Sequence, residues 1–223
     1  MAETQRPAKR ARCEEEPTVA TAIPAPIPDT IETAVASKSL TRIRACTARM
    51  GTDCITATVL AGALSNPLVL SELLRQLPAA TYPATSVAAF RFLLPDGATV
   101  LHRAAAQSTD AAALSVELLL KHRVRVDGPG PTTLSPLCVA AMHGHVGVAR
   151  QLLQGDADVN FRCVIEQMTP LQWACVGSRF QRQEQQSQPA DAQRALDTVE
   201  LLCQHGATVR ARSATGTAVV FAA

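Results

Sequence analysis

Apolar residues recur every three or four positions along most of this chain, and this spacing places them on one face of a helix. The first clear case is a set of four apolar residues that ends at the stop signal Gly51: Leu40, Ile43, Cys46 and Met50. A second case lies in residues 55–77, where apolar runs on both sides of Asn66-Pro67 are closed by Pro78. We therefore predict a helix from residue 40 to residue 50 and two short helices joined by a tight turn within residues 55–77.

A longer period is superimposed on the helical spacing. The segment 99–105, Thr-Val-Leu-His-Arg-Ala-Ala, is echoed by Ser-Pro-Leu-Cys-Val-Ala-Ala at 135–141 and by Thr-Pro-Leu-Gln-Trp-Ala-Cys at 169–175. Each copy is followed by a second apolar run and then by a turn, and the three turns are 122–127, 155–160 and 205–210. A repeat of about 35 residues indicates a stack of similar helical units rather than a single rounded core.

These three copies resemble the ankyrin repeat family, whose repeat begins with T-P-L-H-x-A-A and closes with V-x-x-L-L-x-x-G-A-D-V-N. Ser135 to Asn160 is the best copy, and it includes the Gly144-His145 turn between the two helices. The resemblance implies an all-α solenoid of stacked helix-turn-helix units with short β-hairpin-like loops, preceded by a disordered N-terminal tail. It also implies that Ser135 and Thr169 cap the first helices of their repeats.

The chain departs from the family pattern at several positions. The histidine of the opening motif survives only as His102, and Cys138 and Gln172 replace it in the later copies. Asp156 and Arg123 occupy the position at which the family has a left-handed glycine, and each substitution costs up to about 1 kcal/mol relative to glycine. We therefore expect a divergent stack of moderate stability.

Composition divides the chain further. Five of the fourteen prolines fall in residues 1–38, where apolar periodicity is absent, so this segment is predicted to be disordered. A Gln-rich stretch inside the third repeat predicts an exposed loop with helical extension at either end. The C-terminus begins a further repeat that lacks its second helix, which indicates a fragment, a truncated reading frame or an edge completed by another chain. The predicted divisions are 1–38 (tail), 39–96 (N-terminal helices and a degenerate capping repeat) and 97–223 (ankyrin repeats), the last made of 97–130, 131–165, 166–213 with an insertion at 177–194, and a truncated repeat at 214–223.

Charge and motif content exclude several classes of function. The net charge is only +2, so overall charge does not drive binding to nucleic acid. The sequence lacks a stretch of 18 apolar residues, and its charged, proline-containing N-terminus is not a secretory signal. Glycine-rich phosphate loops and nucleophile elbows are absent, and the seven cysteines do not form a C-x-x-C pair. We expect no catalytic site, metal, cofactor, small-molecule substrate, membrane contact or direct nucleic-acid partner.

The resemblance implies a protein-binding surface instead. In ankyrin stacks the first helices and the hairpin tips line a concave face, and the positions beside the Ala-Ala pair point toward it. The expected partner-binding residues are Arg103, Val139, Met142, Trp173 and Val176 on the helices and Phe161, Arg162, Ile165, Arg210 and Arg212 at the tips. The alternative for Trp173 is that it packs only on its neighbours. We predict a non-catalytic scaffold or adaptor; the alternative is a regulatory or substrate-targeting ankyrin segment of a larger enzyme, such as a kinase or a ubiquitin-ligase subunit.

The tail carries a short basic cluster made of Lys9, Arg10 and Arg12, which is followed by three glutamates. Such a cluster either fits the acidic groove of a nuclear transport receptor or is a solvated run of charge. Unpaired cysteines and the missing secretory signal favour a reducing compartment. We therefore expect a cytoplasmic or nuclear location, or both.

Overall fold

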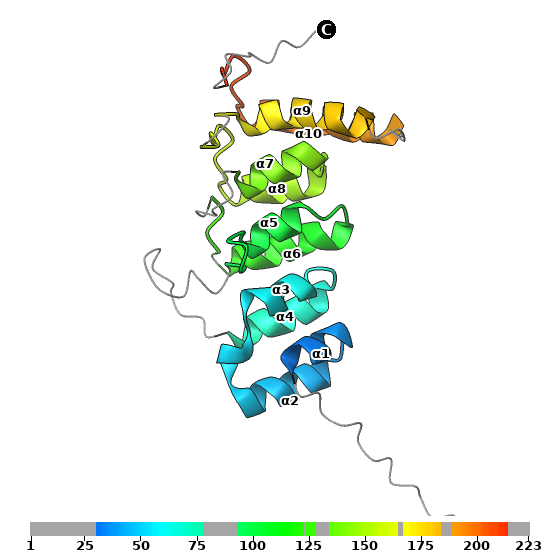
Figure 1. The fold of residues 1–223 in the computed structure, drawn as a ribbon, viewed down its shortest axis with the longest axis vertical. Coiled ribbons are helices and arrows are strands. Elements are labelled where there is room, and N and C mark those ends of the chain that lie inside the picture. Colours follow the sequence, from blue (N-terminus) through cyan, green and yellow to red (C-terminus); the bar gives the residue numbers. More distant parts are fainter. Residues whose placement is uncertain are drawn as a thin grey trace, which may run out of the picture.

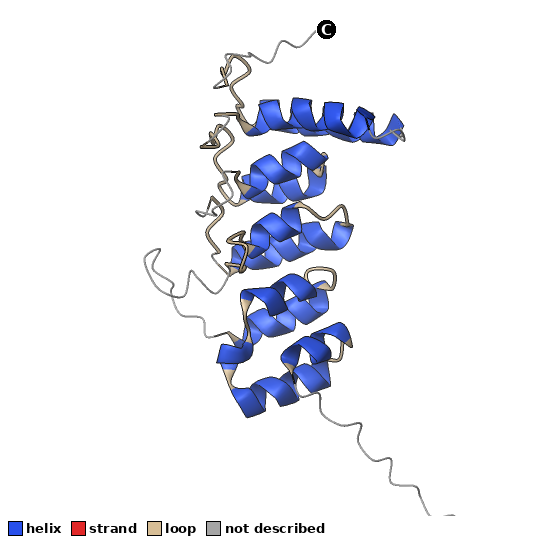
Figure 2. Cartoon of the chain, in the orientation of Figure 1, coloured by secondary structure: helices blue, strands red, loops and turns tan. Residues whose placement is uncertain are grey.

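The computed structural model describes residues 30–77, 93–122, 124–127, 134–164, 167–183 and 189–213. Within these residues the chain is mainly helical (Figure 1, Figure 2). The helices are α1 (Ile31–Ala36), α2 (Leu40–Met50), α3 (Ala57–Ala63), α4 (Pro67–Gln76), α5 (Val100–Ala105), α6 (Asp110–Lys121), α7 (Pro136–His143), α8 (Val146–Gln154), α9 (Pro170–Gln183) and α10 (Pro189–Gln204), with a 3-10 turn η1 (Thr52–Cys54). An isolated β-bridge joins Leu93 and Thr99.

The helices pair along the sequence, and the pairs stack in a column (Figure 1). Helices α3, α5, α7 and α9 contact one another in order and form what we call the first row. Helices α4, α6, α8 and α10 form the second row in the same way, and α1 and α2 cover the end of the column beside α3 and α4. The predicted all-α solenoid is therefore confirmed, and so are the helix predicted at 40–50 and the two predicted within 55–77.

Capping side chains determine where the first-row helices begin. The Ser135 hydroxyl accepts the backbone N–H of Cys138 at 3.2 Å, and Pro136 occupies the first turn of α7, where a missing N–H costs nothing. The Thr169 hydroxyl accepts the N–H of Gln172 at 3.4 Å at the start of α9. Both caps implied by the family motif are present.

Left-handed residues separate the helices of a repeat from each other and from the following hairpin. Gly144 ends α7 with a φ of 68°. Asp156 follows α8 with a φ of 63°, which confirms the strained position predicted for it from the sequence. Arg123, the other residue predicted at such a position, lies outside the described residues.

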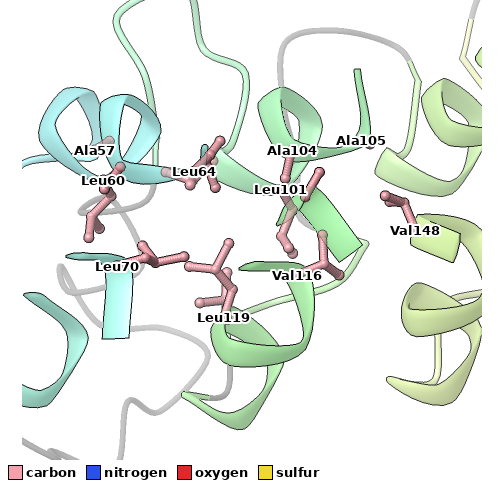
Figure 3. Close-up of a cluster of buried hydrophobic side chains, with 14 of the residues drawn as sticks. Ala57, Leu60, Leu64, Leu70, Leu101, Ala104, Ala105, Val116, Leu119 and Val148 are labelled. Carbon is pink, nitrogen blue, oxygen red and sulfur yellow. The ribbon is translucent and has the colours of Figure 1, made fainter. Parts of the chain in front are cut away.

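A continuous apolar core fills the space between the two rows and passes from one pair of helices to the next. Figure 3 shows the part of it where Leu64 and Leu70 of the α3–α4 pair approach Leu101 and Leu119 of the α5–α6 pair. All four leucines are fully buried. Because each layer of leucines belongs to two neighbouring pairs, no pair completes its core alone, and stability depends on the stacking.

The N-terminal boundary differs from the prediction. Residues 1–38 were predicted to be disordered, but residues 31–36 form helix α1, which begins at the capping hydroxyl of Thr30. Ile31, Ala34 and Val35 are spaced for one helix face and are buried against the stack, with exposed fractions of 4%, 0% and 7%. The predicted tail is therefore too long at its C-terminal end, because a face of only three apolar residues after a proline-rich stretch is a weak helical signal. Residues 1–29 lie outside the described residues.

The insertion predicted at 177–194 is helical at both ends, as predicted, at 177–183 and 189–194, and residues 184–188 lie outside the described residues. Helix α9 has 14 residues and α10 has 16, compared with 8 and 9 for α7 and α8. Both long helices extend past the edge of the column (Figure 1). The predicted truncated repeat at 214–223 lies outside the described residues. Among the described helices, these two included, none is long and apolar enough to cross a membrane.

Candidate functional site

The first-row helices each present one face to the core and another away from it. Leu101, Leu137 and Leu171, at the same position of α5, α7 and α9, are fully buried. Two residues further along, Arg103 is exposed, and Val139 and Trp173 are half-buried. The structure thus places the predicted row of helix residues outside the leucine core and on adjacent helices.

A half-buried apolar strip crosses α7 and α9. It consists of Val139 and Met142 on α7 and Trp173 and Val176 on α9. The indole nitrogen of Trp173 is shielded from solvent and has no hydrogen-bond acceptor within the described residues. The ring of Trp173 is therefore only partly accessible at its predicted binding position.

Helices α7 and α9 approach very closely beside this strip. A Cβ atom added at Gly177 would overlap the carbonyl oxygen of Met142. Only a residue without a side chain fits at this contact. The spacing of the strip is therefore determined by backbone packing and not by flexible side chains.

The hairpin tips carry the remaining predicted residues. Phe161 is half-buried, and Arg162, Arg210 and Arg212 are exposed. Val164 is 72% exposed. Ile165 and the basic cluster of Lys9, Arg10 and Arg12 lie outside the described residues, so their roles stay predictions.

Two buried side chains connect the first-row helices to these loops. His102 Nδ1 accepts the backbone N–H of Thr99 at 3.2 Å, and its Nε2 lies 2.8 Å from the carbonyl oxygen of Leu134. This arrangement requires the neutral ring with its proton on Nε2. Burial lowers the pKa of His102 and so favours that neutral form.

The glutamine that replaces this histidine in the third repeat makes the corresponding contacts. Gln172 Oε1 accepts the N–H of Thr169 at 2.9 Å, and Gln172 Nε2 donates to the carbonyl oxygen of Ala211 at 2.8 Å. Cys138 has a thiol at this position, which accepts a hydrogen bond from the Ser135 hydroxyl of the same repeat at 3.4 Å. The departures from the family motif therefore differ in effect, since glutamine preserves the bridge to the following loop.

The turns of successive repeats are also connected to each other. Asn160 Oδ1 accepts the N–H of Thr208 at 2.8 Å, and Asn160 Nδ2 donates to the carbonyl oxygen of Gly206 at 3.3 Å. Asp127 holds the same place in the preceding turn, and its Oδ2 accepts the N–H of Asp158 at 3.0 Å. Its other oxygen, Oδ1, is buried without a partner in the described part of the chain. Asp127 thus makes half of the contacts that Asn160 makes.

An ion-pair network that the sequence patterns do not predict joins α2 to α4. Arg44 donates to both carboxylate oxygens of Glu72, at 2.8 and 3.0 Å, and Arg75 and Gln76 donate to Oε1 at 2.9 Å each. The Arg44 guanidinium, together with Arg75 and Gln76, holds the pKa of Glu72 well below its usual range. The spacing of Glu72 to Arg75 and Gln76 was visible in the sequence, but the partner on α2 is 28 residues away. The network positions the end of the stack and lies away from the apolar strip.

Several buried titratable side chains have structural partners. Among the described residues, no group of three or more His, Cys, Asp or Glu is arranged to hold a metal ion. The rings of His143 and His145 stack at 5.5 Å, and His145 Nδ1 lies 2.8 Å from the carbonyl oxygen of Ala105. Burial raises the pKa of the Cys138 thiol to about 11, so this thiol is protonated at neutral pH and a poor nucleophile.

Comparison with known proteins agrees with this geometry. Residues 60–163 match the family model for ankyrin repeats, in three copies. No curated protein sequence matches the chain significantly. Among solved structures, the ankyrin repeat domain of Bcl-3, described as a unique member of the IkappaB protein family, matches with a TM-score of 0.60 and 20% sequence identity, over 84% of this chain and 74% of that one. At this identity the likeness shows the fold alone. The matched repeats and the stacked helix pairs together show that residues 60–163 are built from ankyrin repeats.

Proposed function

We propose that this chain is a non-catalytic scaffold or adaptor that binds a protein partner through the apolar strip and the neighbouring hairpin tips. Ankyrin repeats form protein-interaction domains, and the proposal assigns the surface that performs this role here. The observation that carries it is the strip itself: four apolar side chains remain partly accessible on two helices whose core positions are already filled by Leu137 and Leu171.

The strip has the properties of an interface centre. Tryptophan and arginine dominate the binding energy of many protein interfaces. Here Met142 and Trp173 lie on the adjacent helices α7 and α9, and Arg162 lies on the hairpin between α8 and α9. The close contact at Gly177 holds α7 and α9 in place. A partner that binds a preformed surface loses less conformational entropy than one that must order it.

The described chemistry supports a binding role over catalysis. His102 and His145 are hydrogen-bonded to backbone carbonyl groups, and burial lowers their pKa values. Burial also raises the pKa of Cys138 and Cys175. These shifts favour the neutral forms, whereas nucleophilic catalysis needs an activated thiolate or a paired base.

To test the proposal, short random peptides displayed on phage are selected for binding to the immobilised full chain. Selected peptides are then measured against Trp173→Ala and against the control Leu68→Ala, which removes a 72% exposed leucine from the second row. We expect Trp173→Ala to weaken binding by about 2 kcal/mol, roughly thirtyfold, and to change the free energy of unfolding by less than about 1.5 kcal/mol. Peptides that bind Trp173→Ala as tightly as the natural chain would contradict the proposed surface.

A further inference from the structure

The hairpin tips at the C-terminal end of the stack carry an arginine edge, defined here as Arg162, Arg210 and Arg212. All three side chains are exposed. Within the described residues none of the three forms an ion pair, in contrast to Arg44, Arg75 and Lys121. Guanidinium groups match carboxylates in a planar, two-point geometry, so this edge offers unused binding capacity for anions.

The backbone that carries the arginine edge is held in place on both hairpins. Asn160, two residues before Arg162, bonds to the N–H of Thr208, two residues before Arg210, at 2.8 Å. Gln172 Nε2 bonds at 2.8 Å to the carbonyl oxygen of Ala211, which lies between Arg210 and Arg212 in the sequence. The cations are thus attached to loops that are tied to each other and to α9, which lowers the entropy lost when an anion binds.

The spacing of the edge defines what fits it. Arg162 and Arg212 hold the same position in successive hairpins. The two turns end at Asn160 and Arg210, and each arginine of the pair lies two residues after the end of its turn. Stacked helices lie about 10 Å apart, and an extended chain advances about 3.3 Å per residue. Carboxylates about three residues apart in an extended segment therefore match the two arginines.

The surroundings favour a peptide over a nucleic acid. Asp156 and Asp158 are exposed in the turn that leads to Arg162, so the positively charged surface is short. A long run of phosphates would extend over these carboxylates, whereas a short acidic segment can contact Arg162 and Arg212 without reaching them. The net charge of the whole chain is only +2. Phe161 and the 72% exposed Val164 add apolar surface beside Arg162, which suits side chains of a peptide.

We propose that the arginine edge binds an acidic, extended segment of the protein partner, with carboxylates about three residues apart on Arg162 and Arg212. This inference rests on the proposed function, because it assumes that the partner is a protein seated on the adjacent apolar strip. It adds the chemistry of the partner, which the strip alone does not define.

The test uses the same random phage-displayed peptides on the full chain and compares two triple variants. The edge variant carries Arg162→Gln, Arg210→Gln and Arg212→Gln. The control variant removes the same charge from exposed cations on other elements: Arg49→Gln, Lys121→Gln and Arg150→Gln. We expect the natural chain to select peptides enriched in Asp and Glu, and we expect these peptides to bind the edge variant about tenfold more weakly and the control variant less than about twofold more weakly.

The outcomes separate this inference from the proposed function. Selected peptides that depend on Trp173 but show no enrichment of acidic residues would overturn the acidic partner and leave the strip as a binding surface. An equal loss of peptide affinity in the edge and control variants would also overturn the proposed acidic segment, because such a result would show a general effect of charge. Random-sequence duplex DNA serves as a second probe: if DNA binds more tightly than the acidic peptides and is lost in the edge variant, the edge is a nucleic-acid site instead.

Discussion

The side-chain amide of Gln172 donates a 2.8 Å hydrogen bond to the carbonyl oxygen of Ala211 and so attaches α9 to the loop that follows α10. Its Oε1 accepts the N–H of Thr169, as the Nδ1 of His102 accepts an N–H at the start of α5. A primary amide supplies one acceptor and one donor at nearly the reach of a neutral imidazole. The third repeat thus retains the bridge of the family motif without a group that titrates.

We predict that Gln172→Ala lowers the free energy of unfolding by about 1–3 kcal/mol, because it leaves the buried N–H of Thr169 and the carbonyl of Ala211 without their partner. Gln172→His should cost less than about 1 kcal/mol, because the imidazole restores both contacts. Denaturant unfolding of the two variants measures the difference. If both variants lose the same stability, the hydrogen bonds of Gln172 do not stabilise the fold.

The second prediction concerns pH. His102 must be neutral to accept the N–H of Thr99, and burial lowers its pKa in the folded state below the ordinary value of about 6.5. The unfolded chain therefore binds the proton more readily than the folded chain. The stability that neutral His102 contributes is complete above about pH 6.5 and is lost as the pH falls toward the folded-state pKa. His102→Gln, the replacement found at residue 172, should remove it.

The measurement compares unfolding midpoints of the natural chain and His102→Gln between neutral and mildly acidic pH. His143 and His145, whose pKa values burial also lowers, contribute to the slope of both proteins, so only the difference between the two slopes counts. Parallel slopes would show that His102 titrates alike in the folded and unfolded states.

Local signals predicted much of the fold. The cap at Ser135 and the left-handed Asp156 follow from the chemistry of single residues and from the repeat period, and the structure shows both. The repeat motif also identified which residues of the first-row helices lie outside the leucine core. These features depend on neighbours within one repeat, which a sequence displays directly.

Features that depend on distant partners were not predictable. The ion pair of Arg44 with Glu72 joins two elements that no repeat motif relates, and sequence spacing says nothing about such a contact. Helix α1 was missed because its apolar face is only three residues wide and follows a proline-rich stretch. The depth of Trp173 depends on how closely α9 approaches α7, which only the packing at Gly177 reveals.

We predict that Gly177→Ala destabilises the protein by about 1–3 kcal/mol, because the added methyl group would overlap the backbone carbonyl of Met142 and α9 would have to shift away from α7. The control is Gly62→Ala in α3, where the nearest side-chain atom, on Val35, is 3.9 Å from the new Cβ. That substitution should be neutral or stabilise by up to about 1 kcal/mol, because alanine favours a helix over glycine. Thermal unfolding of both variants distinguishes the steric effect from helix propensity, and a stabilised Gly177→Ala would contradict the close approach.

The last prediction exploits the comparison between Asp127 and Asn160, which hold the same place in successive turns. The amide of Asn160 donates to the carbonyl of Gly206, whereas Asp127 has a buried oxygen without a partner in the described part of the chain. Burial, opposed by the hydrogen bond from Asp158, raises the pKa of Asp127, so the ionised form is disfavoured in the folded state. Asp127→Asn should therefore stabilise the protein by about 1 kcal/mol at neutral pH, because it supplies the missing donor and removes the buried charge.

The sign of the pH dependence follows from the raised pKa of Asp127. The cost of burying the ionised carboxylate is present above the folded-state pKa and disappears as the pH falls below the pKa of the unfolded chain, where the carboxyl is protonated in both states. The advantage of Asp127→Asn should shrink over that range, and the reverse change, Asn160→Asp, should destabilise at neutral pH. Unfolding midpoints of the three proteins across this range provide the measurement, and a gain in Asp127→Asn that stays constant with pH would show that the ionised carboxylate is not the source of the cost.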